Sequence, residues 1–261
     1  VSAGNSIVGV TANDNVGGVT ALTNGNYVIN SPNWDGGAVN VGAVTWVNGA
    51  GSSSGTVTAG NSLTGTTLND NVGGGGITAL TNGNYVVRSQ NWDGVAVNTG
   101  AVTWGSGVAG TTGTVSASNS LVGSVANDQV GSGGITALSN GNYAVRSPNW
   151  DNGATLNAGA VTYGAGNGVT TVGPVSTTHS VLGTVANGTL SIGSAAGAVS
   201  LERLVVGRPS SNSATLINPS YLAVANGNWD AASTWDYGQL TQAHDVVIPS
   251  GSTVALNTNI P

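Results

Sequence analysis

The sequence predicts an all-β fold made of tandem repeats, and three observations carry this prediction. A 16-residue motif recurs at a displacement of 58 residues. Short segments rich in Val, Thr, Ile and Tyr alternate with Asn-Gly and Asp-Gly pairs, which is typical of strands joined by turns. No stretch has the apolar spacing and end signals of a helix.

The repeat is clearest in three segments: residues 20–35 (TALTNGNYVINSPNWD), 78–93 (TALTNGNYVVRSQNWD) and 136–151 (TALSNGNYAVRSPNWD). A fixed period of this size indicates one supersecondary unit that buries its apolar face on the next copy. We therefore expect a region of three repeats and the start of a fourth over residues 1–184. The expected repeats cover about residues 5–60, 61–118 and 119–178.

The elements of one repeat follow in order along the chain. Each TALT-NG-NYVV segment predicts a hairpin, with both residues of the Asn-Gly pair in the left-handed region as a type I′ turn requires. These pairs are Asn24-Gly25, Asn82-Gly83 and Asn140-Gly141. A third strand is expected at GAVTW or GAVTY, and a fourth around residues 114–116, leading into NSLVG.

Four short antiparallel strands in a 58-residue repeat have the size of a propeller blade, so we expect β-propeller-like blades. The alternative is a β-solenoid with about three coils per repeat. Coils of that kind also favour Gly, Asn and Thr, so composition does not separate the two folds.

Composition excludes several classes of partner. The chain has 4 Arg, no Lys, 10 acidic residues and a net charge of −6. Binding to nucleic acid or to an anionic membrane needs clustered cations, so neither is expected, and no apolar run is long enough for a membrane-spanning helix.

With 43 Gly and no Cys, the sequence is typical of secreted bacterial surface proteins, and we expect an extracellular location. A first residue other than Met predicts a processed or excised piece.

Two families are similar to the repeats. Residues 127–134 (NDQVGSGG), 138–143 (LSNGNY) and 159–164 (GAVTYG) resemble the FG-GAP blade of integrin-like propellers, which implies blades around an axis. The acidic calcium loop of that family is replaced here by Thr-Asn-Gly-Asn, so calcium binding is not implied. Residues 1–185 more closely resemble tandem repeats of large bacterial exoproteins of the filamentous-haemagglutinin type. That resemblance implies a secreted, surface-associated adhesin or filament protein.

The pattern decays after residues 179–183 (HSVLG). Residues 185–225 are expected to form a degenerate repeat or linker. Residues 226–261, with NGNWDAASTW and DVVIPSGSTV, resemble the opening of right-handed β-helix modules of bacterial surface proteins and are expected to start a second β module.

The Asn-Trp-Asp turn is the candidate ligand site, because an indole beside amide and carboxylate groups suits a sugar. The alternative is that each indole is buried against the next repeat. The candidate residues are Trp34, Asp35, Trp92, Asp93, Trp150 and Asp151. Arg88 and Arg146 hold equivalent positions and are expected to be exposed or paired with nearby Asp.

No set of residues predicts catalysis, a cofactor or a metal site. His179 and His244 have no repeated partner, and the Asp residues of each repeat lie in turns, where they bond backbone amides. We therefore expect a structural or adhesive repeat segment, not an enzyme, with self-association or neighbouring repeats as partners. A carbohydrate-binding lectin that recognises surface glycans through the Trp turns is the alternative.

Overall fold

The computed structural model describes residues 2–51, 54–168, 171–194, 204–211, 213–217, 227–228 and 254–255. The chain divides into two compact units, Val1–Leu190 (unit 1) and Ser191–Pro261 (unit 2). The described elements are all strands apart from the single 3-10 turn η1 (Pro209–Ser211). The prediction of an all-β fold of short antiparallel strands in repeats is confirmed.

Each repeat of unit 1 contributes four antiparallel strands to its own sheet, and the strand order is the same in all three. Repeat 1 has β2 (Gly18–Ala21), β3 (Tyr27–Ser31), β4 (Ala43–Val47) and β6 (Ser62–Thr64). Repeat 2 has β7 (Gly76–Ala79), β8 (Tyr85–Ser89), β9 (Ala101–Gly105) and β11 (Ser120–Val122). Repeat 3 has β12 (Ile135–Ala137), β13 (Tyr143–Ser147), β14 (Ala160–Gly164) and β16 (Ser180–Leu182).

The hairpin between the first two strands has a different turn from the one predicted. Gly25 has a φ of 88°, but Asn24 is outside the left-handed region. The amide of Gly25 donates to the Leu22 carbonyl (3.1 Å), and the Leu22 amide donates to the Asn26 carbonyl (2.8 Å). This is a type I turn followed by a left-handed glycine that forms a bulge. Only the glycine therefore needs a positive φ, and the type I′ prediction is wrong.

A separate two-residue strand in each repeat pairs with a strand of the preceding layer. Gly113–Thr114 (β10) pairs in parallel with β6 of repeat 1, and the Val115 amide continues the ladder to the Thr64 carbonyl at 3.0 Å. The same link joins β5 (Gly55–Thr56) to β1 (Ile7–Val8), and β15 (Gly173–Pro174) to β11. The predicted fourth strand around residues 114–116 is therefore wrong: this segment belongs to the neighbour's sheet, and Ser120–Val122 completes its own.

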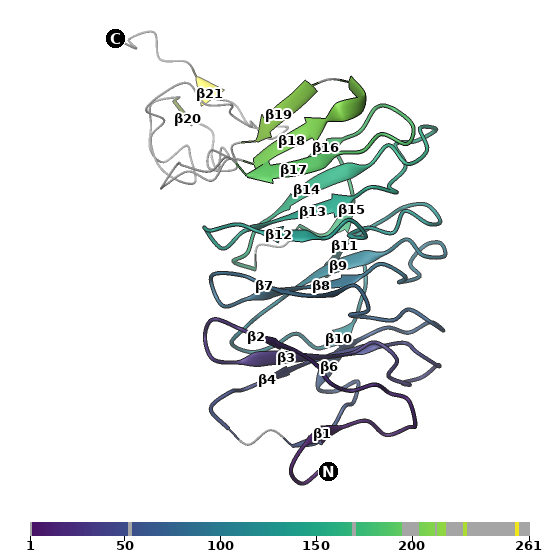
Figure 1. Ribbon diagram of the computed structural model, residues 1–261, viewed down its shortest axis with the longest axis vertical. Coiled ribbons are helices and arrows are strands. Elements are labelled where there is room, and N and C mark those ends of the chain that lie inside the picture. Colours follow the sequence, from purple (N-terminus) through teal and green to yellow (C-terminus); the bar gives the residue numbers. More distant parts are fainter. Residues whose placement is uncertain are drawn as a thin grey trace. The chain divides into compact units, whose positions relative to one another are not determined.

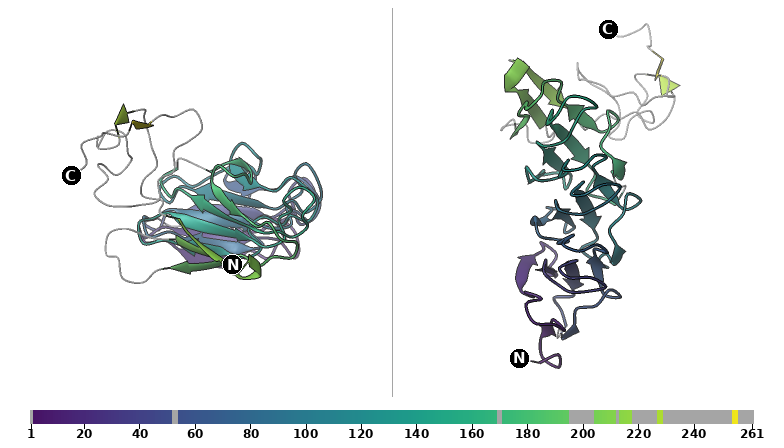
Figure 2. Two further views of the ribbon diagram at one scale, coloured as in Figure 1. Left: turned by 90° about the horizontal axis from the view of Figure 1, so that it is seen from above. Right: turned by 90° about the vertical axis from the view of Figure 1, so that its right-hand side faces the viewer.

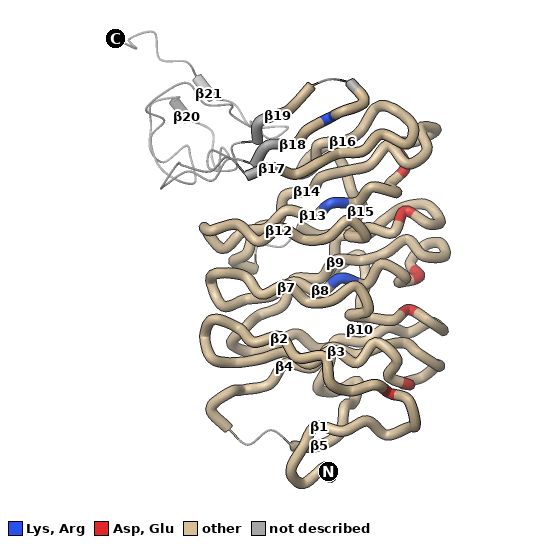
Figure 3. Tube along the Cα trace, viewed as in Figure 1, with Lys and Arg blue, Asp and Glu red and all other residues tan. Residues whose placement is uncertain are grey.

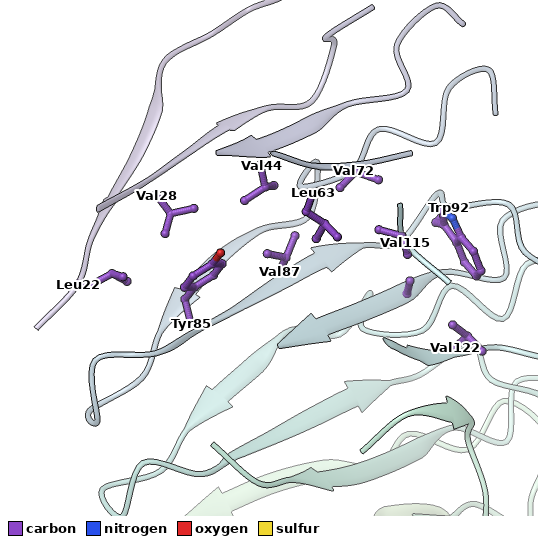
Figure 4. Packing of buried hydrophobic residues seen from close by; sticks show 11 residues of the cluster. Leu22, Val28, Val44, Leu63, Val72, Tyr85, Val87, Trp92, Val115 and Val122 are labelled. Carbon is purple, nitrogen blue, oxygen red and sulfur yellow. The ribbon is translucent and has the colours of Figure 1, made fainter. Parts of the chain in front are cut away.

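Successive sheets stack face to face, and the hydrophobic core lies between them (Figure 1). In β8, Tyr85 and Val87 face repeat 1 while Val86 faces repeat 3, and all three are fully buried. Figure 4 shows the side chains of repeat 1 pointing at those of repeat 2. We call this set the first interlayer core: Leu22, Val28, Val44, Leu63, Val72, Tyr85, Val87, Trp92, Ala101, Val115 and Val122.

Three Thr–Ser hydroxyl pairs join neighbouring strands within the sheets. The Thr45 and Ser62 hydroxyls are 2.7 Å apart, between β4 and β6. The pairs Thr103–Ser120 and Thr162–Ser180 repeat this contact at the same distance. A buried hydroxyl without a partner would destabilise the fold, so these pairs allow polar residues between two apolar layers.

The blades of unit 1 follow one another along a line and do not surround an axis. The three sheets lie one above another in two views at right angles (Figures 1 and 2). The blade of four antiparallel strands expected from the repeat size is confirmed, whereas the arrangement around an axis that the FG-GAP resemblance implies is not found in unit 1. The solenoid alternative is corrected as well, because each layer is a whole antiparallel sheet and only two-residue strands pair in parallel between layers.

Unit 2 contains an antiparallel sheet in the order β17 (Ser191–Ser194), β18 (Leu204–Arg208) and β19 (Ser213–Ile217). The two-residue strands β20 (Gly227–Asn228) and β21 (Val254–Ala255) pair in parallel. The rest of the β module predicted over residues 226–261, with His244, lies outside the described residues.

Candidate functional site

The three indoles of the Asn-Trp-Asp turns lie in the core. Trp34, Trp92 and Trp150 are 5%, 7% and 5% exposed. Each follows a tight turn in which its amide donates to the serine carbonyl three residues earlier, at 3.1 Å for Trp92. Trp92 belongs to the first interlayer core and is seen at the edge of that layer in Figure 4. A sugar has no access to these ring faces, so the predicted stacking of glycans on the Trp turns is corrected.

The aspartates that follow the indoles are half-buried and hold the next turn. Asp35 Oδ1 accepts the Asn40 amide at 2.8 Å, and Asp93 Oδ1 accepts the Asn98 amide at 2.7 Å. Asp151 accepts the Asn157 amide at 2.6 Å. These asparagines have φ values near 50°, so each carboxylate stabilises a left-handed residue in its turn. This explains all three Asp candidates as turn residues.

A second, more deeply buried aspartate in each repeat joins two loops. Asp70 is fully buried, and its Oδ2 accepts the amides of Thr66 and Thr67, both at 2.8 Å. Its Oδ1 accepts the Asp93 amide at 2.9 Å, which ties the loop to the Trp turn. Asp128 makes the same three bonds in the next repeat.

Asp14 shows how these bonds act on the carboxyl group. Burial alone would raise its pKa, but hydrogen bonds from the Thr11 hydroxyl and from the Thr11, Asp35 and Val10 amides together hold the pKa below its ordinary value. Its oxygen atoms are occupied as acceptors. Among the described residues no three His, Asp or Glu side chains gather as a metal site would require.

Each complete interface between repeats contains a backbone carbonyl bound by three side-chain donors, which we call the carbonyl clamp. The Gly107 carbonyl of repeat 2 accepts Asn24 Nδ2 (2.8 Å), Asn26 Nδ2 (2.8 Å) and Trp46 Nε1 (3.0 Å) of repeat 1. The Gly166 carbonyl accepts Asn82 Nδ2 (2.7 Å), Asn84 Nδ2 (2.8 Å) and Trp104 Nε1 (3.2 Å). The clamp therefore holds the hairpin of one repeat to the loop of the next.

Repeat 3 departs from the clamp at one residue. Tyr163 stands where the other repeats have Trp46 and Trp104, and its hydroxyl accepts a hydrogen bond from Asn142 Nδ2. Asn142 is the equivalent of the clamp donors Asn26 and Asn84, so its Nδ2 is bonded within its own repeat.

The two arginines of the repeats bind backbone carbonyls, not Asp. Arg88 donates to the Gly75 and Gly131 carbonyls, the second at 3.3 Å, and Arg146 Nε donates to the Leu190 carbonyl at 2.6 Å. Burial lowers the pKa of Arg88. The expectation of exposed or Asp-paired arginines is wrong, because both side chains are half-buried and donate to backbone carbonyls.

One edge of unit 1, which we call the turn edge, combines asparagine pairs with exposed apolar side chains. The amide side chains join across repeats: Asn40 to Asn69 (3.0 Å), Asn98 to Asn127 (3.2 Å) and Asn157 to Asn187 (3.1 Å). The acidic residues of the stack gather along one edge in Figure 3. The exposed apolar residues next to the pairs are Val39, Leu68, Val97, Val125, Leu156 and Val185.

Four stretches of the chain, residues 1–18, 21–74, 79–132 and 137–194, match the family model of a repeat of unknown function (DUF5650). The chain belongs to this repeat family. The description names neither the FG-GAP blade nor the filamentous-haemagglutinin-type repeat, so the comparison supports tandem repeats without those identities. No curated protein matches the chain. Among the described residues, no helix has the length and apolarity needed to cross a membrane.

Proposed function

We propose that the DUF5650 repeats of this chain form a structural, adhesive segment of a secreted bacterial cell-surface protein or extracellular filament. One observation carries the proposal: the core lies between repeats, so each added repeat extends the stack and stabilises its neighbour. The resemblance of the repeats to bacterial exoproteins supports the bacterial, extracellular setting.

The interface contacts support a role as a spacer of fixed geometry. The interlayer cores, the parallel two-residue strands and the carbonyl clamp recur between repeats 1 and 2 and between repeats 2 and 3. Because all three contacts must be kept together, neighbouring repeats are held in one orientation. Such a stack has a length set by the number of repeats and a fixed direction, and a surface-anchored spacer needs both.

The turn edge is the surface that we propose for adhesion. Its apolar side chains are 42–59% exposed and lie at corresponding turns of successive repeats. Exposed apolar residues that recur along one edge favour contact with another surface over solvation. Unlike the buried indoles, these side chains are accessible without any change in the stack.

The spacer function is tested by removing one repeat. Deleting residues 76–133 joins Gly75 to Gly134, which holds the position of Gly76. We expect a folded protein whose maximum dimension in small-angle X-ray scattering falls by about 10 Å, the spacing of packed sheets. As a control, deleting residues 76–118 leaves β11 without its sheet and should prevent cooperative folding. An unchanged maximum dimension after the 58-residue deletion would contradict the stack.

The adhesive function is tested with beads coated with the protein. We expect coated beads to attach to cultured cells or to one another more than uncoated beads do. Replacing Leu68 and Val97 by Ser should reduce attachment, whereas Val19→Ser, at an equally exposed position on β2, should not. Equal attachment of coated and uncoated beads would reject the adhesive part and leave the spacer part standing.

A further inference from the structure

A hollow of about 240 Å³ opens between repeats 1 and 2. It lies between two equivalent tight turns, residues 31–34 and 89–92, with the glycine loop 73–76 beside them. The lining residues are Pro32, Asn33, Asn71, Gly74, Gly75, Gln90 and Asn91. No charged side chain lines it.

Three carboxamides in this hollow have no partner within the described part of the chain. Asn71 Nδ2 donates to the Pro32 carbonyl at 3.0 Å, but the side chains of Asn33, Gln90 and Asn91 make no hydrogen bond there. All three are half-buried at the junction. Free amides are unusual here, because the asparagines of the carbonyl clamp and of the turn edge are bonded.

The equivalent junction between repeats 2 and 3 differs at four lining positions, one of which is Pro32, replaced there by Gln90. Gln129 replaces Asn71 and accepts a hydrogen bond from Asn149 Nδ2 at 2.6 Å. Ser132 replaces Gly74, and its Oγ is buried; Pro148 replaces Gln90. Asn149 is the equivalent of Asn91, so the same amide is bonded at one junction and free at the other. The hollow is therefore not a requirement of stacking.

We propose that the hollow between repeats 1 and 2 binds one residue of a neutral sugar. A carboxamide both donates and accepts, as a sugar hydroxyl does, so three free carboxamides match several hydroxyls at once. The absence of a lining charge favours a neutral ligand, and the Pro32 ring offers an apolar face for the C–H side of the sugar. The volume is below the range of about 300–1,000 Å³ typical of drug-sized ligands. One ring fits it better than an oligosaccharide.

This inference goes beyond the proposed function, because the spacer needs none of the three free amides. It also differs from the corrected site at the Trp turns: the binding groups are the amides beside the indoles and the indoles stay in the core. Without an aromatic platform we expect millimolar affinity for a single sugar, which tandem contacts would raise.

The test is an NMR titration of the full chain with glucose, galactose, mannose and N-acetylglucosamine. We expect at least one sugar to shift the side-chain amide signals of Asn33, Gln90 and Asn91 in a saturable manner. The signals of Asn149, which donates to Gln129 at the equivalent junction, should not move. Failure of every one of the four sugars to produce saturable shifts at these amides would overturn the proposal.

Asn71→Gln is the decisive variant. It installs the residue found at position 129, and both positions share a left-handed backbone, with φ of 45° and 43°. The longer amide should bond Asn91, fill the hollow and weaken sugar binding about tenfold or more. The new bond to Asn91 replaces the one that Asn71 gives to the Pro32 carbonyl, so the melting temperature should change little. Gln90→Ala with Asn91→Ala should weaken binding likewise, and Asn149→Ala should not. Binding that survives in both hollow variants would overturn the site. The repeat-deletion test uses no ligand, so failure here leaves the spacer proposal intact.

Discussion

Two tyrosines at the same position of successive repeats have different surroundings. Tyr85 opens β8 and is fully buried in the first interlayer core, whereas Tyr27 opens β3 and is only half-buried. A whole four-stranded sheet lies on the Tyr85 side of repeat 2. On the Tyr27 side of repeat 1, the described contacts come from the short pair β1–β5 and the loop that holds Asp14.

The first strands of the two sheets differ in the same way. Val19 on β2 is 63% exposed, while Ile77, its equivalent on β7, packs against the first interlayer core. The repeats have nearly the same sequence here, so burial is set by the neighbour and not by the repeat alone. Stability should therefore be a sum of repeat and nearest-neighbour terms, as in other stacked repeat proteins.

The largest effect is expected from truncating the buried tyrosine. Tyr85→Ala removes a ring from a closed layer and should lower the free energy of unfolding by about 3–5 kcal/mol, as large aromatic-to-alanine changes in cores do. Tyr27→Ala should lower it by less than half as much. Urea denaturation of the two variants measures the difference. Equal losses would show that the neighbouring sheet does not determine burial.

Alkaline pH sharpens the same comparison. Burial raises the pKa of Tyr85 to about 12 and also raises the pKa of Tyr143. As the pH rises, the unfolded state loses the Tyr85 phenol proton before the folded state does. The stability that the buried neutral phenol contributes is therefore complete below pH 10 and is lost as the pH rises to 12. A shift of one pKa unit corresponds to about 1.4 kcal/mol, so ionisation of Tyr85 should lower the free energy of unfolding by roughly 3 kcal/mol.

The measurement is urea denaturation between pH 9 and pH 12 for the wild type and Tyr85→Phe. Tyr85→Phe should flatten the alkaline decline. An identical decline in the wild type and in Tyr85→Phe would contradict the burial of the phenol.

The smallest effect concerns the carbonyl clamp. Trp104→Phe removes one of the three donors to the Gly166 carbonyl and should destabilise by about 1 kcal/mol, the net value of a typical hydrogen bond. The matched control is Trp46→Phe, which removes the equivalent donor to the Gly107 carbonyl in the clamp between repeats 1 and 2. Thermal unfolding with hydrogen exchange at Gly166 and its neighbours should show locally faster exchange in Trp104→Phe and not in Trp46→Phe. Faster exchange at Gly166 in Trp46→Phe as well would argue against the clamp.

Local signals in the sequence predicted the local structure well. The period of 58 residues, the hairpin at Asn24-Gly25 and the strand at GAVTW follow from spacing and turn chemistry and agree with the structure. The turn type was missed because a type I turn with a glycine bulge also favours Asn-Gly, and the pair alone does not separate the two turns.

Contacts between repeats were harder to predict. Gly113 and Thr114 look like the start of the next strand, and only the stacked arrangement shows that they pair with β6. Trp46 and Gly107 are 61 residues apart, so their bond carries no local signal. Identical repeats at a fixed period fit a ring or a line equally well, because the rotation between neighbours depends on side-chain packing.

The central claim, a linear face-to-face stack, is tested most directly by distances between equivalent hairpins. The chain contains no Cys, so cysteines introduced in pairs at Thr23, Thr81 and Ser139 are the sole sites for nitroxide labels. Thr23 and Thr81 contact the next hairpin through their hydroxyls, at 3.4 Å and 3.1 Å. Electron paramagnetic resonance should give a 23/139 distance about twice that of the 23/81 and 81/139 pairs, because residue 139 lies one sheet further along the stack. A 23/139 distance no longer than that of the neighbouring pairs would contradict the stack.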